Sequence, residues 1–229
     1  MLERSIRHAW KACVGETLPW VRIPLSPPSS LRLLAGLDGI RYERADIQTM
    51  ALAERAYDAM WFNNSLHHVR DLEVVCDRVA AAVRPGGVIF VNEYVGADRF
   101  DFPIHQKNAI RAAFALVPER YRRSFLDPGR PVQPAPLFPN PRDVKEADPS
   151  ESVRSSEILK VLEARFEIVA CHNSGGTLLQ FLLHGIAGNF RSDDSDSLAV
   201  LEMLFHIEDT LIDTGALPSD FVLVVARPR

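Results

Sequence analysis

The segment from Tyr57 to Tyr94 constrains the fold more than any other part of the chain. Its hydrophobic pattern predicts a strand at residues 58–62, an amphipathic helix at 71–83 and a continuous buried strand at 88–91. Two strands joined through a helix pair in parallel by a right-handed crossover. The segment therefore predicts part of an α/β sheet.

Three short motifs in this segment carry a family resemblance. They are Tyr57-Asp58-Ala59, Ser65-Leu66-His67-His68-Val69 and Arg84-Pro85-Gly86-Gly87. In these motifs the chain resembles the class I S-adenosylmethionine (SAM)-dependent methyltransferases. The resemblance spans roughly residues 39–229 and implies a Rossmann-like methyltransferase sheet that ends in an antiparallel hairpin, with SAM as the cofactor.

The resemblance also implies a glycine-rich loop, Gly-x-Gly-x-Gly, ahead of these motifs. The first 45 residues hold only Gly15, Gly36 and Gly39, and none of them pair at the spacing that brings backbone N–H groups against a ligand. The expectation is therefore an N-terminally truncated or degenerate sheet. Residues 1–38 are predicted to form an N-terminal helix and a Pro-rich connector, and residues 39–229 a methyltransferase-like α/β domain that opens with a strand at 40–45.

An insertion at about residues 97–150 interrupts the α/β pattern. It contains a predicted helix at 104–116 and a Pro-rich loop, and it is interpreted as a helical lid. Past the insertion, the pattern predicts helices at 152–164, 177–189 and 197–214 and strands at 166–172 and 221–226. The order of helix then strand at the end of the chain agrees with the closing hairpin.

Polar residues follow the predicted strands, at the edge where open α/β sheets bind ligands. The resemblance implies that Asp46 accepts a hydrogen bond from the adenine amine of SAM and that Ile47 packs on the base. Asn63, Asn64 and Ser65 would flank the methionine part of SAM. The alternatives are that Asp46 caps a following helix and that the three later residues only form a turn.

His68 and Glu93 are the predicted catalytic residues. A histidine, with an unperturbed pKa of about 6.5, could accept a proton from a substrate hydroxyl, and Glu93 could orient or deprotonate a nucleophile. The alternatives are that the His67-His68 pair shapes the turn and that Glu93 only bonds a neighbouring loop. No metal site is predicted, because adjacent histidines do not face one another and no third ligand lies at metal-like spacing.

The composition and net charge of the chain limit the kinds of partner that it is expected to bind. The chain has 229 residues, of which 47% are hydrophobic and 24% are charged, with a net charge of −4, so no nucleic acid or membrane partner is expected. The three cysteines have neither disulfide nor zinc-site spacing. The N-terminus has no apolar signal region, and the expected location is cytoplasmic.

Two functions from different classes fit these observations. The first is a SAM-dependent methyltransferase that acts on a small-molecule or sugar-like acceptor. The alternative is a catalytically inactive methyltransferase-like binding or assembly module, in which a homodimer or a partner chain covers exposed sheet edges. A nicotinamide-dependent oxidoreductase is a weaker third option, because it needs the same glycine loop.

Overall fold

A computed structural model describes residues 45–229 of the chain. The helix and the connector predicted within residues 1–38, and the strand at 40–45 except its last residue, lie outside the described residues. Ala45 itself is not in a strand. No helix in residues 45–229 has the length and apolar character needed to cross a membrane.

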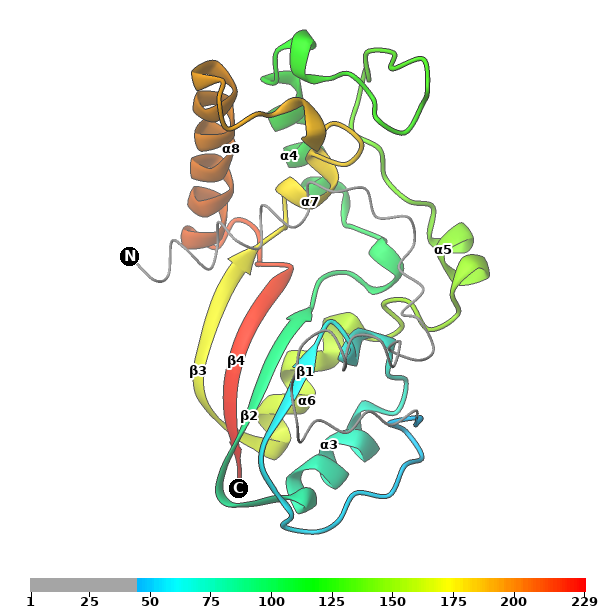
Figure 1. The fold of residues 1–229 in the computed structure, drawn as a ribbon, viewed down its shortest axis with the longest axis vertical. Coiled ribbons are helices and arrows are strands. Elements are labelled where there is room, and N and C mark those ends of the chain that lie inside the picture. Colours follow the sequence, from blue (N-terminus) through cyan, green and yellow to red (C-terminus); the bar gives the residue numbers. More distant parts are fainter. Residues whose placement is uncertain (1–44) are drawn as a thin grey trace, which may run out of the picture.

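A four-stranded mixed sheet forms the centre of the fold (Figure 1). Its strand order is β1-β2-β4-β3, with β1 and β2 parallel and β4 antiparallel to both neighbours. The predicted parallel pair and the predicted closing hairpin are confirmed. The strands are β1 Tyr57–Asn63, β2 Val83–Tyr94, β3 Phe166–Gly175 and β4 Phe221–Pro228.

The Pro85-Gly86-Gly87 motif, which precedes the predicted strand at residues 88–91, lies within the longer strand β2. The pairing of β1 with β2 jumps from Tyr57↔Val83 to Ala59↔Val88, so the extra residues bulge out of β2. Gly86 has φ +80°, as expected for a tight turn, but Gly87 is required for space. A Cβ on Gly87 would lie 2.6 Å from Val83 Cγ1 and 2.8 Å from the Asp58 carbonyl oxygen.

Two helices cover one face of the sheet. Alternate residues of the strands, such as Val91 and Val224, point to this face and form one hydrophobic core with α3 and α6. Figure 1 shows the remaining helices beyond the upper ends of β2 and β3. The helices are α3 Leu72–Ala82, α4 Ile104–Ala115, α5 Pro141–Ala147, α6 Ile158–Arg165, α7 Leu179–Leu182 and α8 Ser195–Asp213.

The upper helices α4, α7 and α8 share a second core, which contains Ile110, Leu182 and Leu204. The region predicted as a lid, residues 97–150, thus packs with later parts of the chain. The prediction of one continuous helix at 177–189 is wrong, because the observed helix α7 is much shorter. It breaks after Leu182, and Gly185 has φ +75°, a left-handed conformation that does not continue a helix.

Two further boundaries differ from the prediction. The helix predicted at 152–164 begins at Ile158, because Ser152 has φ +46° and a 3₁₀ turn, Ser155–Glu157, precedes the helix. The helix α5 was not predicted. Asn140 caps it, accepting from the Arg142 N–H at 2.9 Å, and Pro141 stands at its first position.

Arg154 joins the start of α3 to the turn before α6. Its guanidinium donates to both Glu73 oxygens at 2.7 Å and to both Glu157 oxygens, and it also donates to the Arg70 carbonyl. The hydrogen bonds from Arg154 lower the pKa of Glu73 to about 2. Since the pKa is depressed, this contact stabilises the fold above about pH 4.5, and the contribution is lost as the pH falls toward 2.

We expect Arg154→Ala to lower the free energy of unfolding by about 1 kcal/mol at pH 7, because the carboxylates are partly exposed and solvent screens the pair. Urea unfolding measures this loss. Arg165→Ala is the matched control, since Arg165 bonds an exposed carboxylate, Asp77, through a single contact of 2.8 Å. A loss in Arg154→Ala no larger than in the control would contradict the prediction.

Candidate functional site

Polar residues gather where β1 and β2 end. Asn63, the last residue of β1, is exposed, and its Oδ1 accepts from Asn92 Nδ2 at 2.7 Å. Asn64 has φ +48°, and its N–H donates to the Asn92 carbonyl at 2.8 Å. The turn that follows β1 is thus held against β2 from its first residue.

The side chain of Glu93 holds the rest of this turn. Its side chain is fully buried, and Oε1 accepts from the N–H groups of Ser65 at 2.5 Å and Leu66 at 2.8 Å. Oε2 lies 2.8 Å from His67 Nδ1. Both carboxylate oxygens are therefore engaged with the turn, which corresponds to the alternative in which Glu93 bonds a neighbouring loop.

The two histidines form a short 3₁₀ turn, Leu66–His68, with ring centroids 4.3 Å apart. His67 is buried, and His68 is partly exposed, with its Nδ1 3.0 Å from Ser150 Oγ. Burial of the His68 ring, together with neighbouring His67, lowers its pKa despite three nearby carboxylates. His68 is therefore mainly neutral at pH 7.

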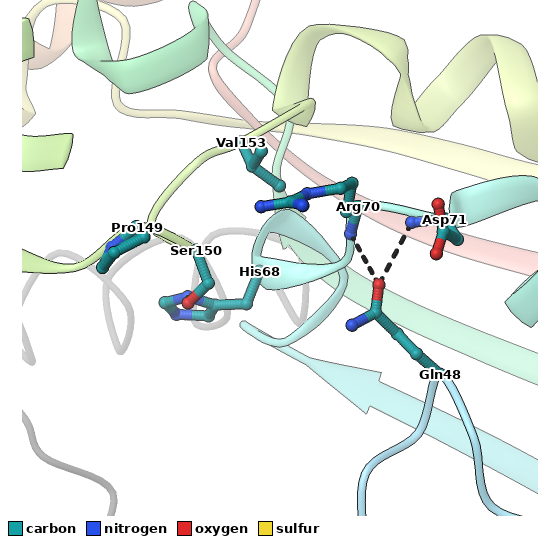
Figure 2. Close-up of a pocket in the computed structure, with 7 residues that line it drawn as sticks. All are labelled: Gln48, His68, Arg70, Asp71, Pro149, Ser150 and Val153. Atoms are coloured by element: carbon teal, nitrogen blue, oxygen red, sulfur yellow. Dashed lines mark hydrogen bonds between the residues drawn. The ribbon is translucent and has the colours of Figure 1, made fainter.

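A turn at residues 46–49 lies beside the start of α3. Asp46 is exposed, and its Oδ1 accepts from the Gln48 N–H at 2.9 Å, so the carboxylate caps a turn and not a helix. Ile47 packs against the core under the sheet. The Gln48 side chain accepts from the N–H groups of Arg70 and Asp71 at 3.1 and 3.2 Å (Figure 2).

A hollow of about 280 Å³ opens between this turn, the histidine turn and the end of the 97–150 region (Figure 2). It is lined by Gln48, His68, Arg70, Asp71, Pro149, Ser150 and Val153. The volume lies just below the range of roughly 300–1,000 Å³ typical of ligand pockets. The described residues thus enclose space for only part of a ligand of the size of SAM.

The fold brings most of the predicted site residues to one edge. Asn63 ends β1, Asn64, Ser65 and His68 follow it, and Glu93 lies near the end of β2. The prediction missed Gln48, Ser150 and Glu151. Nothing in the local sequence identifies the last two, because they stand more than 80 residues after the histidines and reach them only through the path of the 97–150 region.

Part of the chain is similar in sequence to known methyltransferases. Residues 24–91 match a family model described as a methyltransferase domain. The chain is similar to uncharacterised methyltransferases of Mycobacterium bovis and Mycobacterium tuberculosis, with 38% identity over 56 residues, which is 24% of this chain. The chain spans 28% of the length of these relatives.

Solved structures with a similar arrangement are more distant. One is an S-adenosylmethionine-dependent methyltransferase from Mesorhizobium loti, with 18% identity and a TM-score of 0.43, covering 89% of this chain and 77% of that chain. Another is geranyl diphosphate C-methyltransferase from Streptomyces coelicolor, with 14% identity and a TM-score of 0.43, covering 86% and 56%.

Proposed function

We propose that the chain is a class I SAM-dependent methyltransferase, which binds SAM at the carboxyl ends of β1 and β2 and methylates a small-molecule or sugar-like acceptor. The observation that carries the proposal is the polar turn after β1, which Glu93 holds through two backbone N–H groups and beside which Asn63 is exposed. The matched residues 24–91 include this turn.

Methyl transfer from SAM needs little acid–base catalysis by the protein. The sulfonium is a good leaving group, so the enzyme mainly holds the donor carbon and the acceptor atom in line. A turn held by two backbone N–H bonds to one buried carboxylate meets this need, because the groups that face the ligand do not have to be ordered on binding.

His68 is the candidate for removing the proton from an acceptor hydroxyl. Its ring lines the hollow and its pKa is lowered by burial, so the neutral form that accepts a proton is available at pH 7. The remaining predicted contacts are with SAM: Asp46 with the adenine amine, Ile47 with the base, and Asn64 and Ser65 beside the methionine part.

Calorimetric titration of the full chain with SAM, and with its demethylated product, tests the proposal. We expect saturable binding that Asn63→Ala weakens by roughly 3- to 10-fold, the effect of one lost hydrogen bond. Asn108→Ala, at an exposed residue of α4, is the matched control and should bind like the wild type. No binding at millimolar ligand, or equal affinities in the two variants, would contradict the proposed site.

A second candidate function is the inactive assembly module, and one observation favours it. Within residues 45–229, β1 is an edge strand, and the sheet face opposite α3 and α6 carries Trp61, Phe90 and Val225 in register across three strands. Trp61 is 69% exposed. A chain that uses this face for assembly should form dimers that Trp61→Ser disrupts, as measured by sedimentation, without any affinity for SAM.

A further inference from the structure

Three side chains converge beside the histidine turn without bonding one another directly. His67 Nε2 lies 3.8 Å from Glu151 Oε1, and His68 Nε2 lies 3.8 Å from Glu151 Oε2. One ligand atom from each of these residues falls within 4.8 Å of the others. Two atoms bound to the same tetrahedral zinc ion, with bonds of 2.0–2.1 Å, are about 3.4 Å apart, so small side-chain movements would close the set around an ion.

Each of the three side chains has a second partner, which for both histidines is on the ring nitrogen that does not face Glu151. His67 Nδ1 faces the buried Glu93 carboxylate at 2.8 Å, and His68 Nδ1 faces Ser150 Oγ at 3.0 Å. Ser152 Oγ donates to Glu151 Oε1 at 2.8 Å. An acceptor at Nδ1 fixes the tautomer that leaves the Nε2 lone pair free for a metal, which is the usual outer arrangement of metal-binding histidines.

The backbone that carries Glu151 is also fixed. Arg99 donates to the carbonyls of Asp148, Pro149 and Glu151 at 3.2, 2.7 and 2.8 Å. The Val153 N–H donates to the His67 carbonyl at 3.0 Å, which ties the segment to the histidine turn. The backbone segments that carry the three candidate ligands are therefore held in place by hydrogen bonds before any ion binds.

We propose that His67 Nε2, His68 Nε2 and the Glu151 carboxylate bind a divalent metal ion of the zinc class at this point. Two imidazoles and one carboxylate suit zinc and its transition-metal neighbours, whereas magnesium and calcium prefer oxygen ligands alone. Three protein ligands leave a fourth position for water or substrate, as in catalytic zinc sites. His68 lines the hollow, so the ion would lie beside the proposed acceptor space.

Metal binding changes the role of His68. The lone pair on His68 Nε2 can bind a metal ion or accept a proton from the acceptor hydroxyl, but not both. In the metal-bound protein His68 is therefore a ligand and does not act as the base. The ion would also join the sheet edge to the end of the 97–150 region, because the histidines follow β1 and Glu151 lies before α6.

Titration of the chelator-treated full chain with Zn²⁺, without SAM, tests the site and does not depend on the proposed methyl transfer. We expect one bound ion per chain, no competition from Mg²⁺, and at least about 10-fold weaker binding in Glu151→Gln and in His68→Ala. His105→Ala, at an exposed histidine of α4, should bind Zn²⁺ like the wild type.

Cobalt provides a second measurement, since the visible absorption of bound Co²⁺ reports its ligands. The bands should be altered in Glu151→Gln, whose circular dichroism should stay native because Glu151 is partly exposed. An affinity and cobalt spectrum that neither variant alters would overturn the proposal, as would the absence of binding or equal binding of Mg²⁺.

Discussion

Glu93→Ala should lower the free energy of unfolding by about 3–5 kcal/mol, more than any other single change considered for the sheet edge. The substitution removes a fully buried carboxylate and leaves the N–H groups of Ser65 and Leu66 and the Nδ1 of His67 without their acceptor. Breaking a buried charged contact from one side carries a cost of this size, because the remaining partners stay desolvated. Urea unfolding at pH 7 measures the loss.

The control for this prediction lies one residue earlier in β2. Asn92→Ala removes a single side-chain bond, that to Asn63, from a half-buried position and should cost about 1 kcal/mol or less. Glu93→Gln keeps one acceptor oxygen and should fall between the two. If Glu93→Ala were as stable as Asn92→Ala but abolished methyl transfer, Glu93 would be a catalytic group, as the sequence first indicated, and not the support of the turn.

The sequence was most informative where the signal is local. The two parallel strands and the helix between them follow from hydrophobic periodicity, and α3 begins and ends within one residue of the predicted bounds. The closing strand was found for the same reason. The conformation of individual glycines was harder to predict. Gly86 and Gly185 both have positive φ, but only Gly86 lies in a Pro-Gly-Gly sequence, which is typical of turns.

The candidate site was predictable only in part, for a physical reason. Residues at or just after the end of β1, such as Asn63 and His68, are placed by the parallel sheet itself, because the carboxyl ends of parallel strands meet at one edge. Glu151 reaches the same edge through the packing of residues 97–150, which depends on contacts such as those of Arg99. Hence the third candidate metal ligand could not be identified from the sequence, and its apparent absence was one of the two reasons for predicting no metal site.

Asp220 is a buried carboxyl group whose ionisation opposes folding. Its side chain is 2% exposed, and it accepts one hydrogen bond from Gln106 Nε2 at 2.8 Å. Burial raises the pKa of Asp220 to about 7, with a smaller contribution from Glu208, although the bond from Gln106 acts in the opposite direction. Folded protein thus holds a proton at this site that the unfolded chain releases near pH 4.

The sign of the effect on stability follows from this difference. Below about pH 4 Asp220 is protonated in both the folded and the unfolded state, so its ionisation does not change the free energy of unfolding. As the pH rises toward 7, only the unfolded chain releases the proton, and this release favours the unfolded state. We expect Asp220→Asn, which cannot ionise and still offers Gln106 an oxygen, to gain stability relative to the wild type by roughly 2–3 kcal/mol between pH 5 and pH 8.

Urea unfolding of both proteins at the two pH values gives this difference directly, because other groups, such as Glu73, titrate alike in both and cancel. Asp143→Asn, at an exposed position of α5, controls for the loss of one negative charge and should show no comparable gain. A constant difference between Asp220→Asn and the wild type across this range would mean that Asp220 is ionised in the folded protein throughout, and that its surroundings supply enough water or positive charge to hold a carboxylate.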